Sequence, residues 1–316
     1  MRIGVDIGGT NVAIGLLDDK FNIVSRVSIK TVVSRGCKSV VENIVNCIKD
    51  LCAEANLKLY QIESIGIGCP GRVDSEAQML IYANNIPERN VPFCKLISEH
   101  MPRNVRVYIE NDARCAALGE SHFGVTKGAD NSVLVTLGTG IGGGVMINGK
   151  VHKAKGGLGP EIGHMVIHTG GRECSCGRRG CWEAYASGTA LINMTRAAIV
   201  SRPDSLINSL IGGDFSAISC KHPFIAARNG DSVAKHIVSQ YIEYLAEGLA
   251  NVANIFMPDI IAIGGGISNE GAYLIDPAVE LAKKMMYSKN DSNCIIKKAS
   301  LGNKAGTIGA ALLPIS

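Results

Sequence analysis

Three cysteines and a histidine form the most specific chemical feature of the sequence. In "EIGHMVIHTGGRECSCGRRGCWEAYASG", one residue separates Cys174 from Cys176, Cys181 follows, and His164 lies ten residues upstream of Cys174. Three thiolates and one imidazole are the ligand set of a closed, tetrahedral zinc site. The glycines inside "CSCGRRGC" permit the tight fold that brings the sulfurs together. We expect a structural Zn²⁺ at these four residues, with His168 as a rival fourth ligand.

The segment that this metal would brace also carries groups able to bind hydroxyls. A closed zinc site has no coordination position for a substrate, so it stabilises its loop rather than catalysing a reaction. Glu161, His164 and Glu183 lie within or beside the loop. Their side chains can hydrogen-bond to hydroxyl groups, which makes them candidates for binding a substrate.

A second candidate site follows a short apolar strand. In "VRVYIEND", Asn111 and Asp112 stand at the end of the strand, where a helix is expected to begin. Either could simply be the N-cap of that helix, an interpretation that is strong for Asp112 taken alone. The alternative is that Asp112 is a general base, which accepts the proton of an attacking hydroxyl group during phosphoryl transfer. Strand ends are where α/β proteins place such residues.

Three glycine-rich turns could hold the phosphates of a nucleotide. They are Gly8-Gly9-Thr10, 138–144 and 264–266, and each follows an apolar strand. Without a Cβ, successive backbone N–H groups can approach an anion. One such turn would indicate a tight hairpin, but three favour a nucleotide, although none has the Walker or Rossmann spacing. Asp6 is either a turn-capping acid or the group that orients the hydrated Mg²⁺ accompanying ATP.

Alternating strands and helices must position these residues. Helical spacing of apolar residues predicts helices over about 37–55 and 231–256, and others from Asp112, near 183–199 and at "AGTIGAALL". Residues 201–230 read as polar and irregular. The alternation indicates an α/β fold. Apolar runs predict strands at 2–7, 12–17, 24–30, 64–68, 105–110 and 259–268, and "KKAS" ends a last strand.

A weak internal repeat suggests two similar α/β halves. The stretch "NSVLVTLGTGIGGGVMINGK" predicts a strand, a glycine turn and a second strand, ending in an Asn148-Gly149 hairpin turn. Its residues 136–140 match residues 6–10 in architecture, 130 residues later. Each half would then offer a glycine turn.

The composition is that of a globular protein. Hydrophobic residues make up 46% and charged residues 19% of the 316, which excludes wholesale disorder and allows about two domains. A net charge of +4 is too small to indicate a nucleic-acid partner. No run of ~18 apolar residues predicts a membrane span, and "IGVDIGG" is unlike a signal peptide.

The other cysteines are scattered singly in apolar surroundings. Such residues are commonly buried free thiols, and with no secretion signal we expect a cytoplasmic protein. These cysteines are Cys37, Cys47, Cys52, Cys69, Cys94, Cys115, Cys220 and Cys294.

Together these motifs resemble the ROK family (repressors, open reading frames and sugar kinases) over the whole chain. "DIGGTNVAIGLLD" is similar to the first phosphate loop, "GCPGRVD" and "ANNIP" to the sugar-side loops, and "END" to the catalytic Asn-Asp pair. "LGTGIGGGVMINGKVHKAKGGLGPEIGH" resembles the family signature, "CSCGRRGCWEAYAS" its zinc motif and "IIAIGGGIS" its nucleotide-side loop.

The resemblance implies an actin-like, ribonuclease-H-like ATPase fold, in which two similar α/β domains close around a sugar and ATP. We expect a small domain at 1–113 plus about 303–316 and a large domain at 114–302. Asp112 would be the base, and His164 would serve zinc and sugar with one ring nitrogen each. The implied sugar ligands are Asn85, Asn111, Asp112, Glu161, His164 and Glu183, and the nucleotide-side residues are Asp6, Gly8, Gly9, Thr10, Gly138, Thr139, Gly265 and Gly266.

Family members are kinases or transcriptional repressors, and this sequence favours a kinase. The phosphate loop begins at residue 6, which leaves no room before it for the repressors' helix-turn-helix domain, and "END" and "DIGGT" are intact. The implied reaction transfers the γ-phosphoryl group of ATP to O6 of a hexose. "GCWEAYASGTAL" is most similar to bacterial glucokinases, which favours glucose. The alternatives are an N-acetylmannosamine or N-acetylglucosamine kinase and, in another class, a non-catalytic sugar-responsive regulator. A homodimer is typical of the family.

Overall fold

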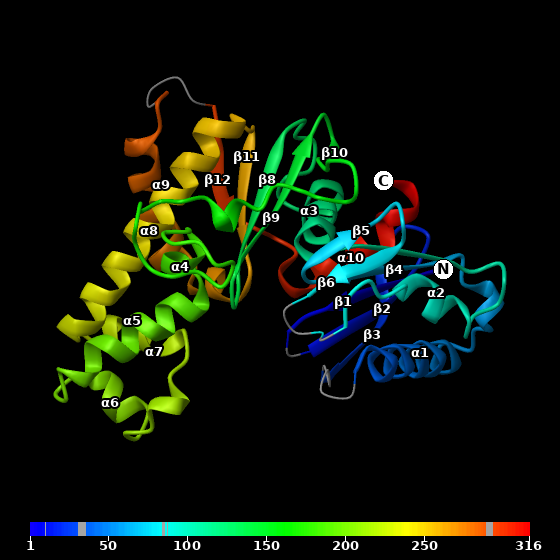
Figure 1. The fold of residues 1–316 in the computed structure, drawn as a ribbon, viewed down its shortest axis with the longest axis horizontal. Coiled ribbons are helices and arrows are strands. Elements are labelled where there is room, and N and C mark those ends of the chain that lie inside the picture. The colour runs from blue at the N-terminus through cyan, green and yellow to red at the C-terminus, as the bar shows by residue number, and fades with distance from the viewer. Residues whose placement is uncertain (10, 31–35, 84–85, 87, 289–292) are drawn as a thin grey trace. The chain divides into compact units, whose positions relative to one another are not determined.

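The computed structural model of the chain describes residues 1–9, 11–30, 36–83, 86, 88–288 and 293–316, and Figure 1 labels its elements. The chain forms two compact units. Unit 1 comprises Met1–Leu134, Gly144–Pro160 and Ser300–Ser316, and unit 2 comprises Val135–Gly143 and Glu161–Ala299. Unit 1 therefore includes helix α3 (Asp112–Phe123), whereas the boundary expected at 113 assigns that helix to the second domain. The expected domain boundaries stay a prediction.

Unit 1 contains a five-stranded sheet in the order β3-β2-β1-β4-β7. The first three strands form an antiparallel meander, and β4 and β7 run parallel to β1. All five match strands predicted from the sequence. Their bounds are β1 Arg2–Ile7, β2 Asn11–Leu17, β3 Ile23–Lys30, β4 Ser64–Cys69 and β7 Arg106–Asn111.

Helices cover both faces of this sheet. Along β1, Ile3, Val5 and Ile7 join the apolar core that also contains buried residues of helix α1 (Gly36–Glu54). Gly4 and Asp6 alternate with them and meet helix α10 (Ala305–Leu312) on the opposite face, since strand side chains alternate with a period of two. Asp6 therefore points away from the main core of the unit, toward α10.

Helices α3 and α10 cross at very short range. A Cβ at Gly309 would overlap the carbonyl oxygen of Cys115, and one at Gly119 would overlap that of Ala305, so glycine on each helix permits the approach. Because α10 also packs on β1 and β4, it fixes α3 against the sheet. The remaining elements of unit 1 include β5 (Arg72–Asp74), β6 (Met79–Tyr82) and α2 (Phe93–Ser98).

The second sheet has the order β10-β9-β8-β11-β12, the same pattern as the first. It agrees with the repeat seen in the sequence. Asn148 and Gly149 both have positive φ, 51° and 71°, as the predicted hairpin turn requires. The strands are β8 Ser132–Leu137, β9 Ile141–Ile147, β10 Lys150–Val151, β11 Ile260–Gly264 and β12 Ile295–Lys298.

The helices of unit 2 pack around α8 (Ser232–Phe256), a long helix expected from the sequence. Two expectations were wrong. The helix expected near 183–199 is broken at Ser187, whose hydroxyl instead caps the next helix by accepting from the N–H of Ala190 at 3.1 Å. Residues 201–230 are not irregular throughout. The other helices are α4 Glu183–Ala186, α5 Gly188–Val200, α6 Leu206–Leu210, α7 Lys221–Arg228 and α9 Ala272–Met285.

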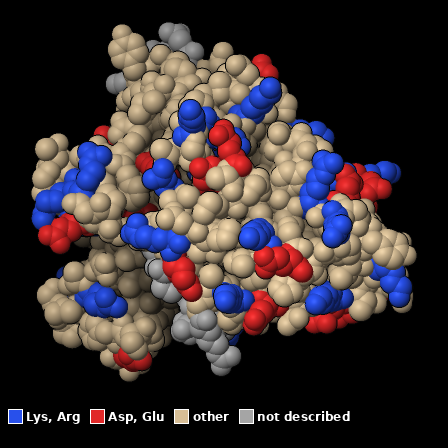
Figure 2. All heavy atoms as spheres, turned by 45° about the vertical axis from the view of Figure 1, so that its right-hand side comes forward, with Lys and Arg blue, Asp and Glu red and all other residues tan. Residues whose placement is uncertain are grey.

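Surface charge and burial follow the composition. On the face drawn in Figure 2, basic and acidic side chains are interspersed. Of the eight scattered cysteines, Cys47 and Cys220 are half-buried and the other six are buried. Within the described ranges, we find no helix long and apolar enough to span a bilayer.

Candidate active site

In unit 1, predicted site residues gather at one end of the parallel strands. The chain leaves β1 at Ile7 and β7 at Asn111, which are carboxyl ends of strands that run in the same direction. The N–H of Gly8 donates to the carbonyl of Asn11 at 2.8 Å and closes the first glycine turn. Ligands bind at such edges in open α/β sheets. Two expected residues, Thr10 and Asn85, lie outside the described residues.

Asn111, rather than Asp112, is the N-cap of α3. Its side-chain oxygen accepts from the N–H groups of Ala113 and Arg114 at 3.0 and 3.2 Å, and its amide nitrogen donates to the carbonyl of Gly71 at 3.2 Å. Asp112 is the first residue of the helix, where the backbone N–H groups favour a negative charge. The capping interpretation therefore applies to Asn111, and the carboxyl group of Asp112 is half-buried beside it.

Two carboxyl groups interact at this edge. Burial of the carboxyl group and then the negative charge of Asp112 raise the pKa of Asp6 to about 7, although Arg26 acts in the opposite direction. Asp6 packs against Gly306 at the start of α10. A cation bound here would favour the ionised form of Asp6, and carboxylate oxygens are the ligands that Mg²⁺ prefers. The donor set therefore fits a hydrated Mg²⁺.

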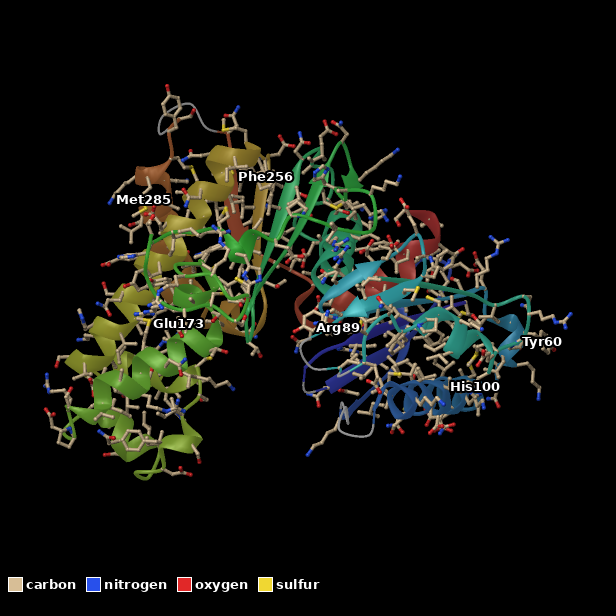
Figure 3. All side chains as sticks on the ribbon, viewed as in Figure 1. Tyr60, Arg89, His100, Glu173, Phe256 and Met285 are labelled. Atoms are coloured by element: carbon tan, nitrogen blue, oxygen red, sulfur yellow. The ribbon has the colours of Figure 1, made fainter. Side chains whose placement is uncertain are left out.

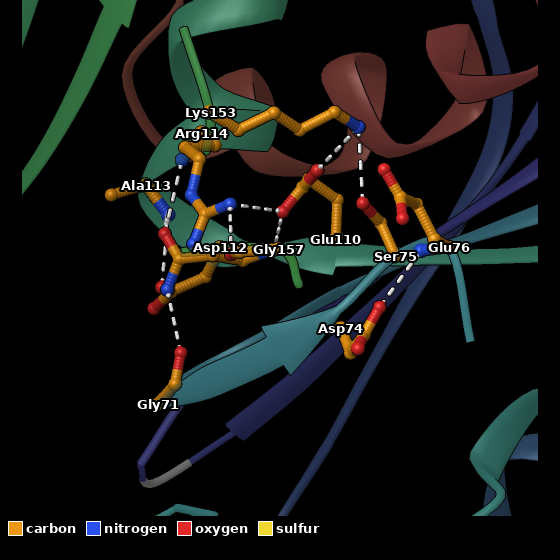
Figure 4. A network of polar contacts seen from close by, with 11 residues as sticks. Gly71, Asp74, Ser75, Glu76, Glu110, Asp112, Ala113, Arg114, Lys153 and Gly157 are labelled. Atoms are coloured by element: carbon orange, nitrogen blue, oxygen red, sulfur yellow. Dashed lines mark hydrogen bonds and ion pairs between the residues drawn. The ribbon is translucent and has the colours of Figure 1, made fainter. Parts of the chain in front are cut away.

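A buried ion pair joins Glu110 and Arg114, the residues that flank Asn111 and Asp112 closely in the sequence (Figure 4). The guanidinium of Arg114 contacts Oε1 of Glu110 at 2.8 Å and donates to the carbonyl of Gly157 at 2.8 Å. The ammonium of Lys153 contacts Oε2 of Glu110 at 3.3 Å and Oγ of Ser75 at 3.0 Å. The turn at Ser75 and the loop that contains Lys153 and Gly157 are thereby tied to the strand end that carries Asn111 and Asp112.

The nucleotide-side residues of unit 2 lie on two turns that touch. The N–H of Gly138 donates to the carbonyl of Gly140 at 3.0 Å, which closes the turn after β8. Gly265 follows β11 with a φ of 83°, and a Cβ there would overlap the backbone of Leu137. The structure therefore brings Gly138, Thr139 and Gly265 to neighbouring strand ends.

The Cys/His cluster converges as the sequence suggests. Donor atoms of His164, Cys174, Cys176 and Cys181 all lie within 4.8 Å of one another. Backbone pairing brings them together, since Val166 bridges to Cys181 and Met165 accepts from the N–H of Trp182. Among the described residues His168 is not part of this group, because its ring stacks on Tyr185 with centroids 6.0 Å apart.

The distances within the cluster fit a tetrahedral metal. Sγ of Cys176 and Sγ of Cys181 are 3.7 Å apart, and Nδ1 of His164 is 3.5 Å from Sγ of Cys174. Zinc bonds of about 2.3 Å to sulfur and about 2.0–2.1 Å to nitrogen give tetrahedral edges of about 3.8 and about 3.6 Å. Nδ1 of His164 faces the sulfurs, so the ring nitrogen left for other contacts is Nε2.

The segment 161–183 carries the Cys/His cluster, is called the metal loop below, and is anchored to the core of unit 2. Trp182 is fully buried, its indole N–H donates to the carbonyl of Tyr244 at 2.8 Å, and a Cβ at Gly248 would overlap its ring. Of the predicted hydroxyl-binding groups beside the loop, Glu161 is exposed and precedes the turn 162–164. Glu183 instead has hydrogen-bond partners within unit 2.

Sequence reasoning missed the Glu110–Arg114–Lys153 network and Ser175. Glu110 and Arg114 carry opposite charges four residues apart, but Glu110 lies on the strand before the helix, so the pair spacing of helices does not predict their contact. Lys153 and Ser175 carried no signal either, since each is one of many polar residues in a loop.

Comparison with known proteins identifies relatives over the full length of the chain. The sequence model of the ROK family matches residues 2–316. A glucokinase of Thermotoga maritima is 36% identical, covering 98% of this chain and 95% of the relative. An N-acetyl-D-glucosamine kinase of Mannheimia succiniciproducens is 32% identical, covering 99% of both chains.

Solved structures agree in fold. The crystal structure of a ROK family glucokinase from Streptomyces griseus in complex with glucose and AMPPNP matches with a TM-score of 0.86 and 34% identity, covering 99% of this chain and 98% of that one. The expected fold class, an actin-like ATPase fold of mixed α/β type, is confirmed.

The buried ion pair predicts a large stability loss for Arg114→Met. The side chains of Arg114 and Glu110 are 4% and 3% exposed, so the variant leaves Glu110 with a buried, under-compensated charge. We expect the free energy of unfolding, measured by urea titration, to fall by about 3–5 kcal/mol. The matched control is Arg179→Met, whose pair with Glu173 (labelled in Figure 3) is 2.7 Å long but 55% and 83% exposed. The control should lose less than about 1 kcal/mol, and equal losses would contradict the account.

The raised pKa of Asp6 predicts a pH-dependent stability. The folded protein holds this proton up to about pH 7, whereas the unfolded chain releases it near 3.8, so the contribution of Asp6 becomes less favourable as pH rises through that window. The difference between the two pKa values corresponds to a loss of roughly 4 kcal/mol in the free energy of unfolding across this pH range. Asp6→Asn should remove this decline, so the variant gains stability relative to wild type between pH 4 and pH 7 in urea titrations. Parallel profiles for Asp6→Asn and wild type would exclude the effect.

Proposed function

The chain belongs to the ROK family, and on this premise we propose that it is an ATP-dependent sugar kinase that phosphorylates glucose at O6. The observation that carries the proposal is the junction of β7 and α3, where Asn111 is the N-cap and Asp112 is the first residue of the helix. Full-length likeness to a ROK glucokinase solved with glucose and AMPPNP supports the choice of both substrates.

Asp112 is the general base of the proposed reaction. It accepts the proton of the O6 hydroxyl as O6 attacks the γ-phosphorus of ATP, and the bond from that phosphorus to the ADP oxygen breaks. The Glu110–Arg114 pair and the capping bonds of Asn111 hold the strand end that presents Asp112. The sugar ligands of the proposal are Asn85, Asn111, Asp112, Glu161, His164 and Glu183.

The glycine turns hold the nucleotide. Backbone N–H groups of the turns can donate to phosphate oxygens, and Asp6 orients the hydrated Mg²⁺, which supplies positive charge to the phosphoryl oxygens when bound. The nucleotide-side residues are Asp6, Gly8, Gly9, Thr10, Gly138, Thr139, Gly265 and Gly266.

A structural Zn²⁺ held by His164, Cys174, Cys176 and Cys181 is part of the proposal. The distances among their donor atoms support it. His164 turns Nδ1 toward the metal position, which leaves Nε2 for a sugar hydroxyl. We also propose a cytoplasmic location and a homodimer; these rest on the sequence and the family.

An N-acetylhexosamine kinase is the second candidate, because the N-acetyl-D-glucosamine kinase relative is 32% identical over nearly full length. The two are separated by offering Mg²⁺-ATP with glucose, fructose, mannose, N-acetylglucosamine and N-acetylmannosamine and measuring ADP release. Release with none of them would favour a non-catalytic sugar-responsive regulator.

Asp112→Asn tests the proposed base. The amide keeps the shape of the side chain but cannot accept the proton, so we expect glucose binding by calorimetry within about threefold of wild type and kcat lowered by about 10²–10⁴-fold. Asp214→Asn, at an exposed position that caps a short turn of unit 2, is the control and should keep wild-type turnover. A variant at position 112 with comparable kcat would remove Asp112 from the role.

Removing the metal tests its structural role. We expect elemental analysis to find zinc in the purified protein, and chelation to raise hydrogen exchange over 161–183 and to weaken glucose binding, because the loop loses its cross-link. A metal-free protein that keeps both its exchange protection and its affinity for glucose would contradict this assignment.

A further inference from the structure

Glu183 joins the metal loop to the glycine turn after β8. Its Oε2 accepts from the N–H of Ile141 at 2.9 Å, and its Oε1 accepts from the hydroxyl of Ser175 at 3.3 Å. Ser175 lies between the cluster residues Cys174 and Cys176. All these residues belong to unit 2, and each carboxylate oxygen therefore contacts a different structural feature of that unit.

The glycine turn is held on the same side by the start of α5. The carbonyl of Gly138 accepts from the N–H of Gly188 at 2.8 Å, and the carbonyl of Thr139 accepts from Oγ1 of Thr189 at 2.8 Å. A Cβ at Gly140 would overlap Oε2 of Glu183, so only glycine permits this approach. Residues 183–189 thus hold the turn 138–141 along its length.

We propose that Glu183 is a positioning residue for the nucleotide, which transmits the ordered state of the metal loop to the turn 138–141. This inference rests on the proposed function, in which that turn binds the phosphates. A turn held in place before binding loses less conformational freedom when the nucleotide arrives. Loss of the link from Glu183 to Ile141 should therefore weaken nucleotide binding even with no sugar present.

The sign of the effect separates this role from two others. A carboxylate beside an anion site repels phosphate, so if charge alone mattered, removing it would tighten nucleotide binding. If Glu183 were only a sugar ligand, nucleotide affinity without sugar would not change. Positioning predicts that Glu183→Ala weakens binding, whereas Glu183→Gln retains it, because the glutamine oxygen can still accept from Ile141 and its NH₂ group can contact Ser175.

The experiment measures the Kd of Mg²⁺-AMPPNP by calorimetry on the full, zinc-loaded chain without sugar. We expect Kd about tenfold weaker for Glu183→Ala, the scale of one hydrogen bond, and within about twofold of wild type for Glu183→Gln. Glu173→Ala is the control: it lies on the same loop, is exposed and pairs with Arg179, and should leave Kd unchanged. Zinc content and the urea midpoint confirm that each variant is folded.

Ser175→Ala keeps the inference testable should Glu183→Ala fail to fold. It removes only the hydroxyl that contacts Oε1, so we expect a Kd about threefold weaker. Unchanged or tighter nucleotide binding in a folded Glu183→Ala variant would overturn the positioning role. If Glu183→Ala does not fold, unchanged nucleotide binding in Ser175→Ala would overturn it. A wild-type protein that does not bind Mg²⁺-AMPPNP would instead overturn the proposed function.

Discussion

The capping of α3 by Asn111 is the interaction on which the site in unit 1 depends. Every helix begins with N–H groups that need acceptors, and here the amide oxygen of Asn111 supplies one for two of them. Asp112 consequently begins the helix without serving as its N-cap. The buried Glu110–Arg114 pair stabilises the same junction, and Arg114 also donates to the carbonyl of Gly157 on a neighbouring loop. Removing one partner of a buried pair leaves an uncompensated charge, so these contacts constrain the strand end, the helix start and the neighbouring loop together.

In unit 2 the site residues lie on or beside a long loop, 161–183, most of whose residues are not buried. The loop is closed by the Cys/His cluster at one side and anchored by buried Trp182 at the other. Glu183 follows directly, in the first turn of α4, and there it meets the glycine turn. Three of the four cluster residues, the buried Trp182 and the carboxylate of Glu183 therefore lie within ten residues, from 174 to 183. Supporting contacts of this kind orient the residues that ligate a metal.

Periodic and compositional signals were enough to predict most of this fold. The strands of both sheets except β10, and helices α1 and α8, follow from apolar spacing, and the cluster of three cysteines and His164 follows from ligand types and spacing. The break at Ser187 was missed because an apolar run continues across it, and only the cap to Ala190 ends one helix and begins the next. The ion pair of Glu110 with Lys153 joins segments that are far apart in the sequence. Ser175, which contacts Glu183, is one of many polar residues in its loop. No local pattern therefore predicts either contact.

We propose that the carboxylate at the start of α3 activates a sugar hydroxyl. A crystal structure of the wild-type protein with glucose and a non-hydrolysable ATP analogue tests it most directly, through the distance from the Asp112 oxygens to O6. We expect a distance of about 2.6–3.2 Å, within hydrogen-bond reach. A bound glucose whose O6 lies well beyond that reach, with the Asp112 carboxylate turned to solvent, would contradict it.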